Sequence, residues 1–206
     1  MIRLTVLLAS LFVILPLSKG APRVSTDEKL YLPTTVGDKL VFERTTQLPV
    51  GEDKETLTAL VADVDRKDGL VVTIQYRYGK EEKPRRTFKF HASDKGIFWL
   101  ENNEKAFKEP KCQLKLPLRA GDTWESLFDG RPDITVKYTT GKEEDVEVPA
   151  GKFRAVRIDS VMTVKDSKFE TTDWYAPGVG LVKSTSRASN GVTDVKVLKS
   201  FTPGKK

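Results

Sequence analysis

The sequence VEVPAGKFRAVRIDSVMTV spans residues 146–164, and KFETTDWYAPGVGLVKS follows over residues 168–184. Both segments alternate apolar and polar residues, which is the period of a half-buried β-strand. Pro149-Ala150-Gly151 and Pro177-Gly178 interrupt the alternation, and proline and glycine favour a tight reversal of the chain. The stretch therefore predicts four successive strands joined by tight turns, which is an antiparallel sheet.

The same period continues along the rest of the chain. In LVVTIQYRY, residues 70–78, apolar side chains recur at every second position, and Asp68-Gly69 precedes them as a turn signal. We expect roughly ten to twelve strands, more than a flat sheet carries comfortably. The predicted fold is all-β, an antiparallel curved sheet or half-open barrel. Two smaller expectations are a helical turn over residues 125–128 and a β-bulge near Arg154, where the apolar side chains change phase.

Residues 1–20 have the features of a signal peptide. Arg3 precedes an apolar run over residues 4–17, and Ser18-Lys19-Gly20 provides the small residues that a signal peptidase needs before Ala21. The apolar run is short for a membrane span. We expect cleavage after Gly20 and export to the periplasm or the extracellular space, with no membrane span after cleavage. An uncleaved N-terminal anchor is the alternative.

Residues 21–206 are predicted to form a single β-rich domain. One motif occurs twice in it, because Leu32-Pro33, three residues and Gly37-Asp38 return as Leu116-Pro117, three residues and Gly121-Asp122. The repetition indicates two related halves, residues 31–110 and 115–206, each of which would open with the same turn. A chance match over so short a window is the alternative.

The composition argues against most catalytic and metal chemistry. Cys112 is the only cysteine and His91 the only histidine, so an internal disulfide is excluded and a histidine-based metal site or triad has little to build on. A hydrolase would need a carboxylate pair that the sequence does not single out. The formal net charge of +6 mixes 35 Lys and Arg with 29 Asp and Glu residues, which does not indicate nucleic acid as a partner. We predict no enzyme, no cofactor and no metal.

Two local motifs favour ordinary turns over binding sites. The run from Asp63 to Gly69 resembles the start of a calcium loop, but Ile74 stands where that loop needs an acidic ligand, so a hairpin turn is predicted. The basic run Lys83-Pro84-Arg85-Arg86 would suit phosphates or acidic glycans, but its proline and the neighbouring acids favour a solvated hairpin tip.

Aromatic residues supply the candidate ligand-binding side chains Trp99, Trp174 and Tyr76. They would line a groove for an apolar or sugar ligand or, alternatively, fill the core of the sheet. The leading hypothesis is an exported, non-enzymatic protein whose curved sheet binds a lipid or another hydrophobic ligand. The alternative is a structural or protein-interaction module of the cell envelope, with an envelope protein or polysaccharide as its partner and no small ligand.

Three phrases resemble those of TapB-like exported bacterial proteins, a group of unknown function. They are Tyr31-Leu32-Pro33 with Gly37-Asp38, Val148-Pro149-Ala150-Gly151 with Phe153, and WYAPGVGLV over residues 174–182. Leu40 stands where that group usually has tryptophan, which Trp124 supplies in the second copy. Such proteins are similar in outline to LolA/LolB-like half-barrels, lipoprotein carriers that hold acyl chains in a curved sheet. The resemblance implies a half-barrel and an exported location, and it brings no catalytic residues.

Overall fold

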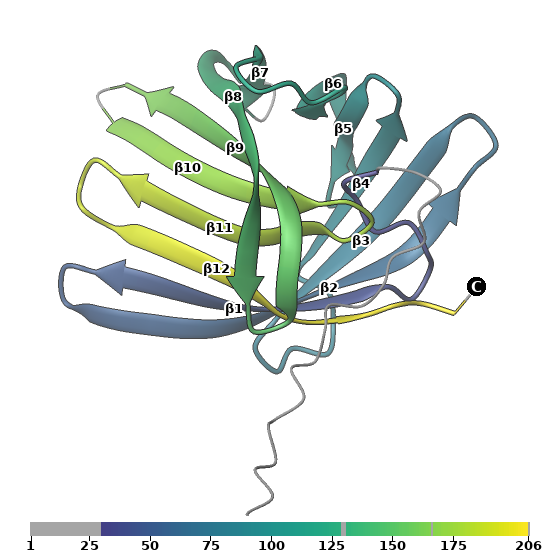
Figure 1. The fold of residues 1–206 in the computed structure, drawn as a ribbon, viewed down its shortest axis with the longest axis horizontal. Coiled ribbons are helices and arrows are strands. Elements are labelled where there is room, and N and C mark those ends of the chain that lie inside the picture. The colour runs from purple at the N-terminus through teal and green to yellow at the C-terminus, as the bar shows by residue number, and fades with distance from the viewer. Residues whose placement is uncertain (1–29, 129–130, 166, 206) are drawn as a thin grey trace, which may run out of the picture.

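The structure is a computed structural model that describes residues 30–128, 131–165 and 167–205. The predicted signal peptide, residues 1–20, lies outside these ranges. Within them the regular structure is entirely β-strand (Figure 1). The strands are β1 (Lys39–Leu48), β2 (Gly51–Asp65), β3 (Leu70–Tyr78), β4 (Arg86–Ser93), β5 (Gly96–Asn102), β6 (Lys105–Lys115), β7 (Thr123–Phe128), β8 (Arg131–Val148), β9 (Gly151–Val164), β10 (Ser167–Ala176), β11 (Gly180–Ala188) and β12 (Thr193–Thr202).

The strands form one antiparallel sheet in the order β6-β5-β4-β3-β2-β1-β12-β11-β10-β9-β8-β7. Every ladder joins strands that follow one another in the chain, except the ladder between β1 and β12. Two meanders, β1–β6 and β7–β12, therefore meet along that ladder. The sheet curls until its edge strands β6 and β7 approach each other (Figure 1). The predicted all-β, half-open barrel is confirmed.

The gap between β6 and β7, called the seam here, has no backbone pairing among the described residues, and side chains of its two strands make single hydrogen bonds instead. In the described part of the chain no ladder joins the two strands. The indole Nε1–H of Trp124 in β7 donates to the Cys112 carbonyl of β6 at 3.4 Å. The Gln113 amide of β6 donates to the Tyr175 hydroxyl of β10 at 3.2 Å. Because side-chain bonds replace a ladder, the seam is the place where the barrel stays open.

The hairpin of β8 and β9 departs from the regular curl. Its far end crosses β10, β11 and β12 in Figure 1, and the backbone N–H of Ala150 in its turn donates to the Leu198 carbonyl of β12 at 3.1 Å. The bend coincides with a register shift between Thr140 and Glu143 of β8. An extra residue in one strand bends that strand and strengthens its twist. The bulge therefore directs the hairpin across the neighbouring strands.

Two sequence expectations are corrected here. The bulge expected near Arg154 in β9 lies instead in β8, at Gly141 and Lys142, opposite Arg157. Residues 125–128 form part of strand β7 and not a helical turn, because they pair with β8. A change of phase in the apolar side chains does not show which of two paired strands carries the extra residue. The prediction therefore assigned the bulge to the wrong strand.

The two local turn predictions are confirmed. The motif from Asp63 to Gly69 forms the β2–β3 turn, where the Asp65 carboxylate accepts a hydrogen bond from the Lys67 N–H at 2.9 Å. The basic run lies at the end of the β3–β4 connection, with Arg85 3.9 Å from Glu81 and 5.2 Å from the centre of the Tyr78 ring. Both motifs therefore serve as hairpin connections.

The repeated motif folds in the same way at both of its positions. Gly37 N–H donates to the Val61 carbonyl at 2.9 Å, and Val61 N–H donates back to the Asp38 carbonyl at 2.9 Å. The second copy repeats this pair of bonds, with Gly121 donating to Thr140 at 2.8 Å and Thr140 donating to Asp122 at 2.8 Å. A register shift follows directly after Val61 in β2, as it does after Thr140 in β8. The duplication of residues 31–110 and 115–206 stays a prediction, but the two turns share one geometry.

Candidate functional site: a cavity on the concave face

The concave face of the sheet encloses a cavity of about 350 Å³. It lies within the size range of small-molecule sites, toward the lower end. Most of its wall comes from the first meander together with the segment that leads into β1, and the rest comes from β10, β11 and β12. The lining residues are Tyr31, Leu32, Pro33, Leu40, Phe42, Leu57, Ala59, Ile74, Tyr76, Tyr78, Arg86, Phe88, Phe90, Ile97, Trp99, Gln113, Leu114, Thr171, Asp173, Tyr175, Val179, Gly180, Leu181, Ser184 and Lys196.

The wall from β3, β4 and β5 is aromatic. Phe88 stacks on Trp99 with ring centres 5.3 Å apart and planes 2° apart, and Tyr76 meets Phe88 edge-on at 5.3 Å. Such pairs hold the rings in fixed orientations and present their faces and edges as apolar surface. The indole Nε1 of Trp99 is buried and has no hydrogen-bond acceptor among the described residues. A buried donor normally has an acceptor, so the Trp99 indole N–H is an unsatisfied polar group within this otherwise apolar wall.

The opposite wall is polar. The strand register pairs Arg44 of β1 with Lys196 of β12, Lys196 with Ser184 of β11, and Ser184 with Asp173 of β10. Directly opposed residues of antiparallel strands share a face of the sheet. Arg44, Lys196, Ser184 and Asp173 therefore form one line across the sheet, which we call the polar row. Three members of the polar row, Lys196, Ser184 and Asp173, line the cavity.

The charges of the polar row are only partly neutralised. Arg44 Nε lies 2.6 Å from the Asp194 carboxylate, so this guanidinium is paired. No carboxylate of the described residues lies within 4.0 Å of the Lys196 ammonium. Lys196 Nζ lies 5.6 Å from the centre of the Phe42 ring. Lys196 is therefore a cation that borders an apolar cavity without an ion-pair partner.

Burial acts on both ionisable groups of this wall. It lowers the pKa of Lys196, although the negative charges of Asp173 and Asp194 oppose the shift. Burial also raises the pKa of Asp173, against the hydrogen bond with Ser184 and the charge of Lys196. In each case the protein environment disfavours the charged form. Perturbed groups of this kind, placed in a cavity, are typical of functional sites.

Burial favours the neutral form of two tyrosines that line the cavity, Tyr76 and Tyr175. Burial raises the pKa of Tyr76 to about 12. Burial, followed by the charge of Asp173, raises the pKa of Tyr175 well above its usual value, although the hydrogen bond with Gln113 opposes the shift. Neutral phenols act as hydrogen-bond donors or acceptors. They can therefore orient a ligand without adding charge.

The structure separates the three predicted ligand-binding residues. Trp99 and Tyr76 line the cavity, whereas Trp174 does not. The indole N–H of Trp174 donates to the carboxylate of Glu144, and Lys183 Nζ lies 4.8 Å from the centre of its ring. Trp174 lies between Asp173 and Tyr175, which face the cavity, so strand alternation directs it to the other face. Ligand binding by these residues stays a prediction.

Sequence reasoning missed the polar row. Asp173 and Lys196 each stand at an inward position of an alternating strand, where an apolar residue is the rule. A charged residue at such a position would have been the signal. This signal is weak in β10 and β12, because their inward faces also carry Thr171 and Asp194 near the strand ends. A further charged residue therefore does not stand out against an apolar pattern.

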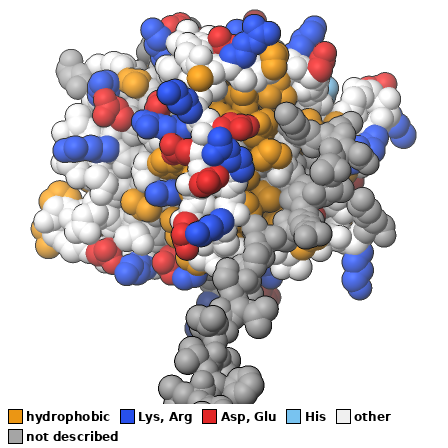
Figure 2. All heavy atoms as spheres, viewed as in Figure 1, with side chains coloured by type: hydrophobic (Ala, Val, Ile, Leu, Met, Phe, Trp, Pro, Cys, Tyr) orange, Lys and Arg blue, Asp and Glu red, His pale blue; other side chains and the backbone are white. Residues whose placement is uncertain are grey.

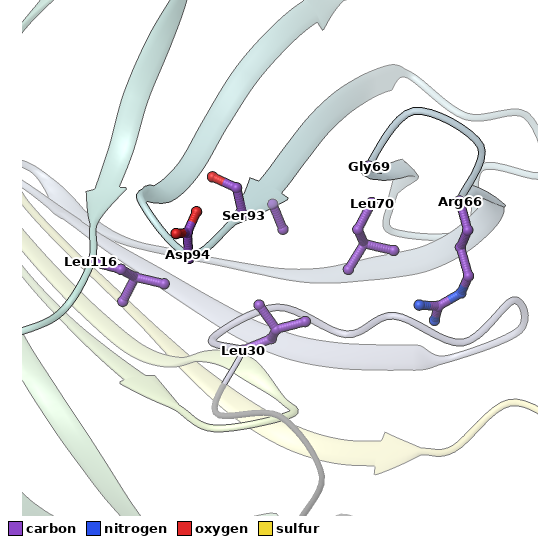
Figure 3. A pocket seen from close by; sticks show the side chains of 8 residues that line it. Leu30, Arg66, Gly69, Leu70, Ser93, Asp94 and Leu116 are labelled. Carbon is purple, nitrogen blue, oxygen red and sulfur yellow. The ribbon is translucent and has the colours of Figure 1, made fainter.

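Two further hollows lie beside the connections between strands. One, of about 480 Å³, has Leu30, Leu70 and Leu116 facing one another, with Asp94 and Arg66 at its sides (Figure 3). The other, of about 620 Å³, borders the β8 bulge. Both are formed largely by turns and by the segments that lead into β1 and β7, and neither gathers perturbed ionisable groups. The concave cavity is the better candidate for a site.

Metal-ligand groups, long apolar helices and the lone cysteine are the other features to consider outside the cavity. In the described ranges, no three His, Cys, Asp or Glu side chains group together as metal ligands. No helix there is long and apolar enough to cross a membrane. The face drawn in Figure 2 interleaves acidic and basic side chains, with hydrophobic side chains gathered between them. Cys112 is free and half-buried, and burial raises the pKa of its thiol.

Comparison with known families gives one match. The DUF3108-like family matches residues 134–194, which run from β8 to the start of β12 and include the crossing hairpin. No curated protein matches this chain. These similarities do not test the narrower resemblance to TapB-like proteins, which stays a prediction.

Solved structures share the fold. A candidate exported protein with a YmcC-like fold from Bacteroides fragilis superposes with a TM-score of 0.56 at 16% identity, covering 83% of this chain and 98% of that chain. A candidate lipoprotein from Parabacteroides distasonis gives a TM-score of 0.55 at 15% identity, over 86% and 100% of the two chains. A LolA superfamily protein from Nitrosomonas europaea reaches a TM-score of only 0.29 at 8% identity, over 85% and 90%, which is too low to support an argument. The first two similarities establish the fold alone.

Proposed function

We propose that this chain is an exported, non-enzymatic protein that binds a hydrophobic ligand on the concave face of its sheet. The observation that carries the proposal is the cavity of about 350 Å³, which the side chains of the concave face leave between an aromatic and a polar wall. A sheet that served only as a scaffold would be expected to fill that space, because protein interiors pack closely. The similarity to candidate exported proteins and the TapB-like resemblance are consistent with this location.

The cavity wall suits binding better than catalysis. Its charged side chains are Lys196 and Asp173 of the polar row together with Arg86, and neither a histidine nor a cysteine is among the lining residues. Apolar lining with a few placed polar groups is the common character of small-molecule sites. Binding without chemistry therefore needs nothing beyond the side chains that line the cavity.

A short-range quenching experiment tests the proposal. The methyl ester of a nitroxide-labelled lauric acid is a neutral apolar probe, and a nitroxide quenches tryptophan only near contact. We expect it to quench the fluorescence of the protein, and the variant Trp99→Phe to lose that quenching. The matched variant Trp174→Phe should keep it, because Trp174 does not line the cavity. Ala59→Phe, which would place a ring in the cavity floor, should prevent binding.

Native mass spectrometry of the unextracted protein supplies an independent readout. Co-purified apolar molecules that organic solvent removes would support the proposal. A ligand-free protein that shows no quenching by the probe would overturn it. The chain would then be better described as an envelope interaction module, and protein or polysaccharide partners would be sought.

A further inference from the structure

The two walls of the cavity differ in chemistry, and this difference specifies the ligand further. We propose that the ligand is a single-chain amphiphile with an anionic head, whose head pairs with Lys196 while its chain lies against the aromatic wall. The inference rests on the proposed function, since it names the ligand class of the same cavity.

The volume favours one chain. A cavity of about 350 Å³ is near the lower limit for sites that enclose a drug-sized molecule. Leu57, Ala59 and Phe88 line it with apolar side chains that offer no hydrogen bonds. An alkyl chain gains free energy there by leaving water. A lipid with two chains would leave one of them outside the cavity.

The charges favour an anion. The cavity wall carries two cations, Lys196 and Arg86, and one carboxylate, Asp173. Asp173 already has a hydrogen bond with Ser184, whereas Lys196 has no ion-pair partner within 4.0 Å among the described residues. A charge beside an apolar cavity is stabilised only when it is paired or hydrogen-bonded. An anionic head would supply Lys196 with an ion-pair partner. A cationic head would be repelled by the charges of Lys196 and Arg86.

Of the two cations in the polar row, only Lys196 lacks an ion pair with a described carboxylate. Arg44, directly opposite it in β1, is held by Asp194 at 2.6 Å and lies 3.9 Å from Glu55. A head group at this wall would therefore meet Lys196 before any other available cation of the row. The lowered pKa of Lys196 is consistent with a site that lacks its counter-ion.

Calorimetric titration with three ligands of equal chain length tests the inference. Laurate, dodecanol and dodecylamine, used below their micelle concentrations, differ only in the charge of the head. We expect laurate to bind about tenfold more tightly than dodecanol, and dodecylamine to bind most weakly. Lys196→Met should remove the preference for laurate and leave the affinity for dodecanol unchanged. Lys196→Arg should retain most of the preference, because it keeps the charge.

Two further variants keep the result interpretable. Lys199→Met removes an exposed lysine of the same strand, which pairs with Glu43, and should leave the preference unchanged. Asp173→Asn removes the one carboxylate of the wall and should strengthen laurate binding. Circular dichroism of each variant confirms that the sheet is folded.

The failures of the two proposals are distinguishable. If dodecanol binds as tightly as laurate, the anionic head is wrong and the hydrophobic site stands. If dodecylamine binds most tightly, Asp173 recognises the head and the inference is overturned. If none of the three ligands binds to the folded protein, the proposed function itself fails.

Discussion

The two meanders of the barrel, β1–β6 and β7–β12, build the same turns and present different inner faces. Each begins with a Gly-Asp turn that makes the same pair of backbone hydrogen bonds, and each has a bulge directly after the strand residue that this turn contacts. The first meander lines the cavity with apolar and aromatic side chains, and the second contributes Asp173, Ser184 and Lys196. Backbone geometry is therefore shared, while the site arises from the side chains that differ.

Each meander contains one stacked pair of aromatic rings, and the two pairs differ in what they contact. Trp124 stacks on Tyr138 with ring centres 4.9 Å apart and planes 5° apart, and Trp124 is buried against the seam. In the first meander, Trp99 makes a similar stack with Phe88 but borders the cavity. One stack thus supports the fold and the other forms a wall.

The largest expected effect separates these two stacks. Trp124→Ala should lower the free energy of unfolding by about 3–5 kcal/mol, because it opens a hole in a packed region and removes the bond to Cys112. Trp99→Ala should cost about half as much, since its ring already faces open space. Urea unfolding of both variants measures the difference. Equal losses would contradict the distinction between a supporting stack and a cavity wall.

The next prediction concerns pH and the wall of the first meander. The Tyr76 phenol has a pKa of about 12 in the folded protein, against about 10 in an unfolded chain. The unfolded state therefore ionises first, and stability falls as the pH rises from about 10 to 12, by up to roughly 3 kcal/mol. Tyr76→Phe removes this contribution and should unfold less readily than the parent at pH 11.5. Urea midpoints at pH 7 and 11.5 supply the test, and a parallel alkaline loss in both proteins would show that Tyr76 is not the group responsible.

A third prediction compares the two Gly-Asp turns. The buried Asp38 carboxylate accepts bonds from Thr35 N–H at 2.9 Å and Gly204 N–H at 2.8 Å. Asp122 is half-buried, and its carboxylate has no such donor among the described residues. Asp38→Ala should cost about 2–3 kcal/mol because it leaves two donors unpaired. Asp122→Ala should cost less than about 1 kcal/mol. Similar losses in thermal unfolding would mean that the two turns are equivalent in energy as well as in geometry.

The smallest expected effect has the opposite sign. Lys196→Met should raise the stability of the ligand-free protein at pH 7 by about 1 kcal/mol. Burial disfavours the charged ammonium, which the variant lacks, and the methionine side chain replaces the apolar stem of the lysine. A rise in the urea midpoint with an unchanged slope would indicate a group retained for binding. A fall would show instead that attraction to Asp173 and Asp194 outweighs the cost of burial.

The sequence predicted the fold better than the site. Alternation along residues 70–78 and 146–184 identified strands, and the pairs of proline and glycine identified the turns between them, because both signals act over a few residues. Trp99 and Tyr76 were predicted as candidate ligand-binding residues and do line the cavity. Trp174 was grouped with them because the residue type does not show whether an aromatic side chain lies on the inner or the outer face of a strand.

Local features were readable from the sequence alone, namely the strand period and the two Gly-Asp turns, and the number of strands indicated a sheet that curls. Three other features emerged only from the folded chain: β1 pairs with β12, the β8–β9 hairpin crosses its neighbours, and Lys196 and Asp173 face the aromatic wall around Trp99. These features depend on contacts between residues far apart in the chain. The two-residue period of a β-strand determines which side chains share a face of the sheet. How the sheet closes determines which residues lie opposite that face.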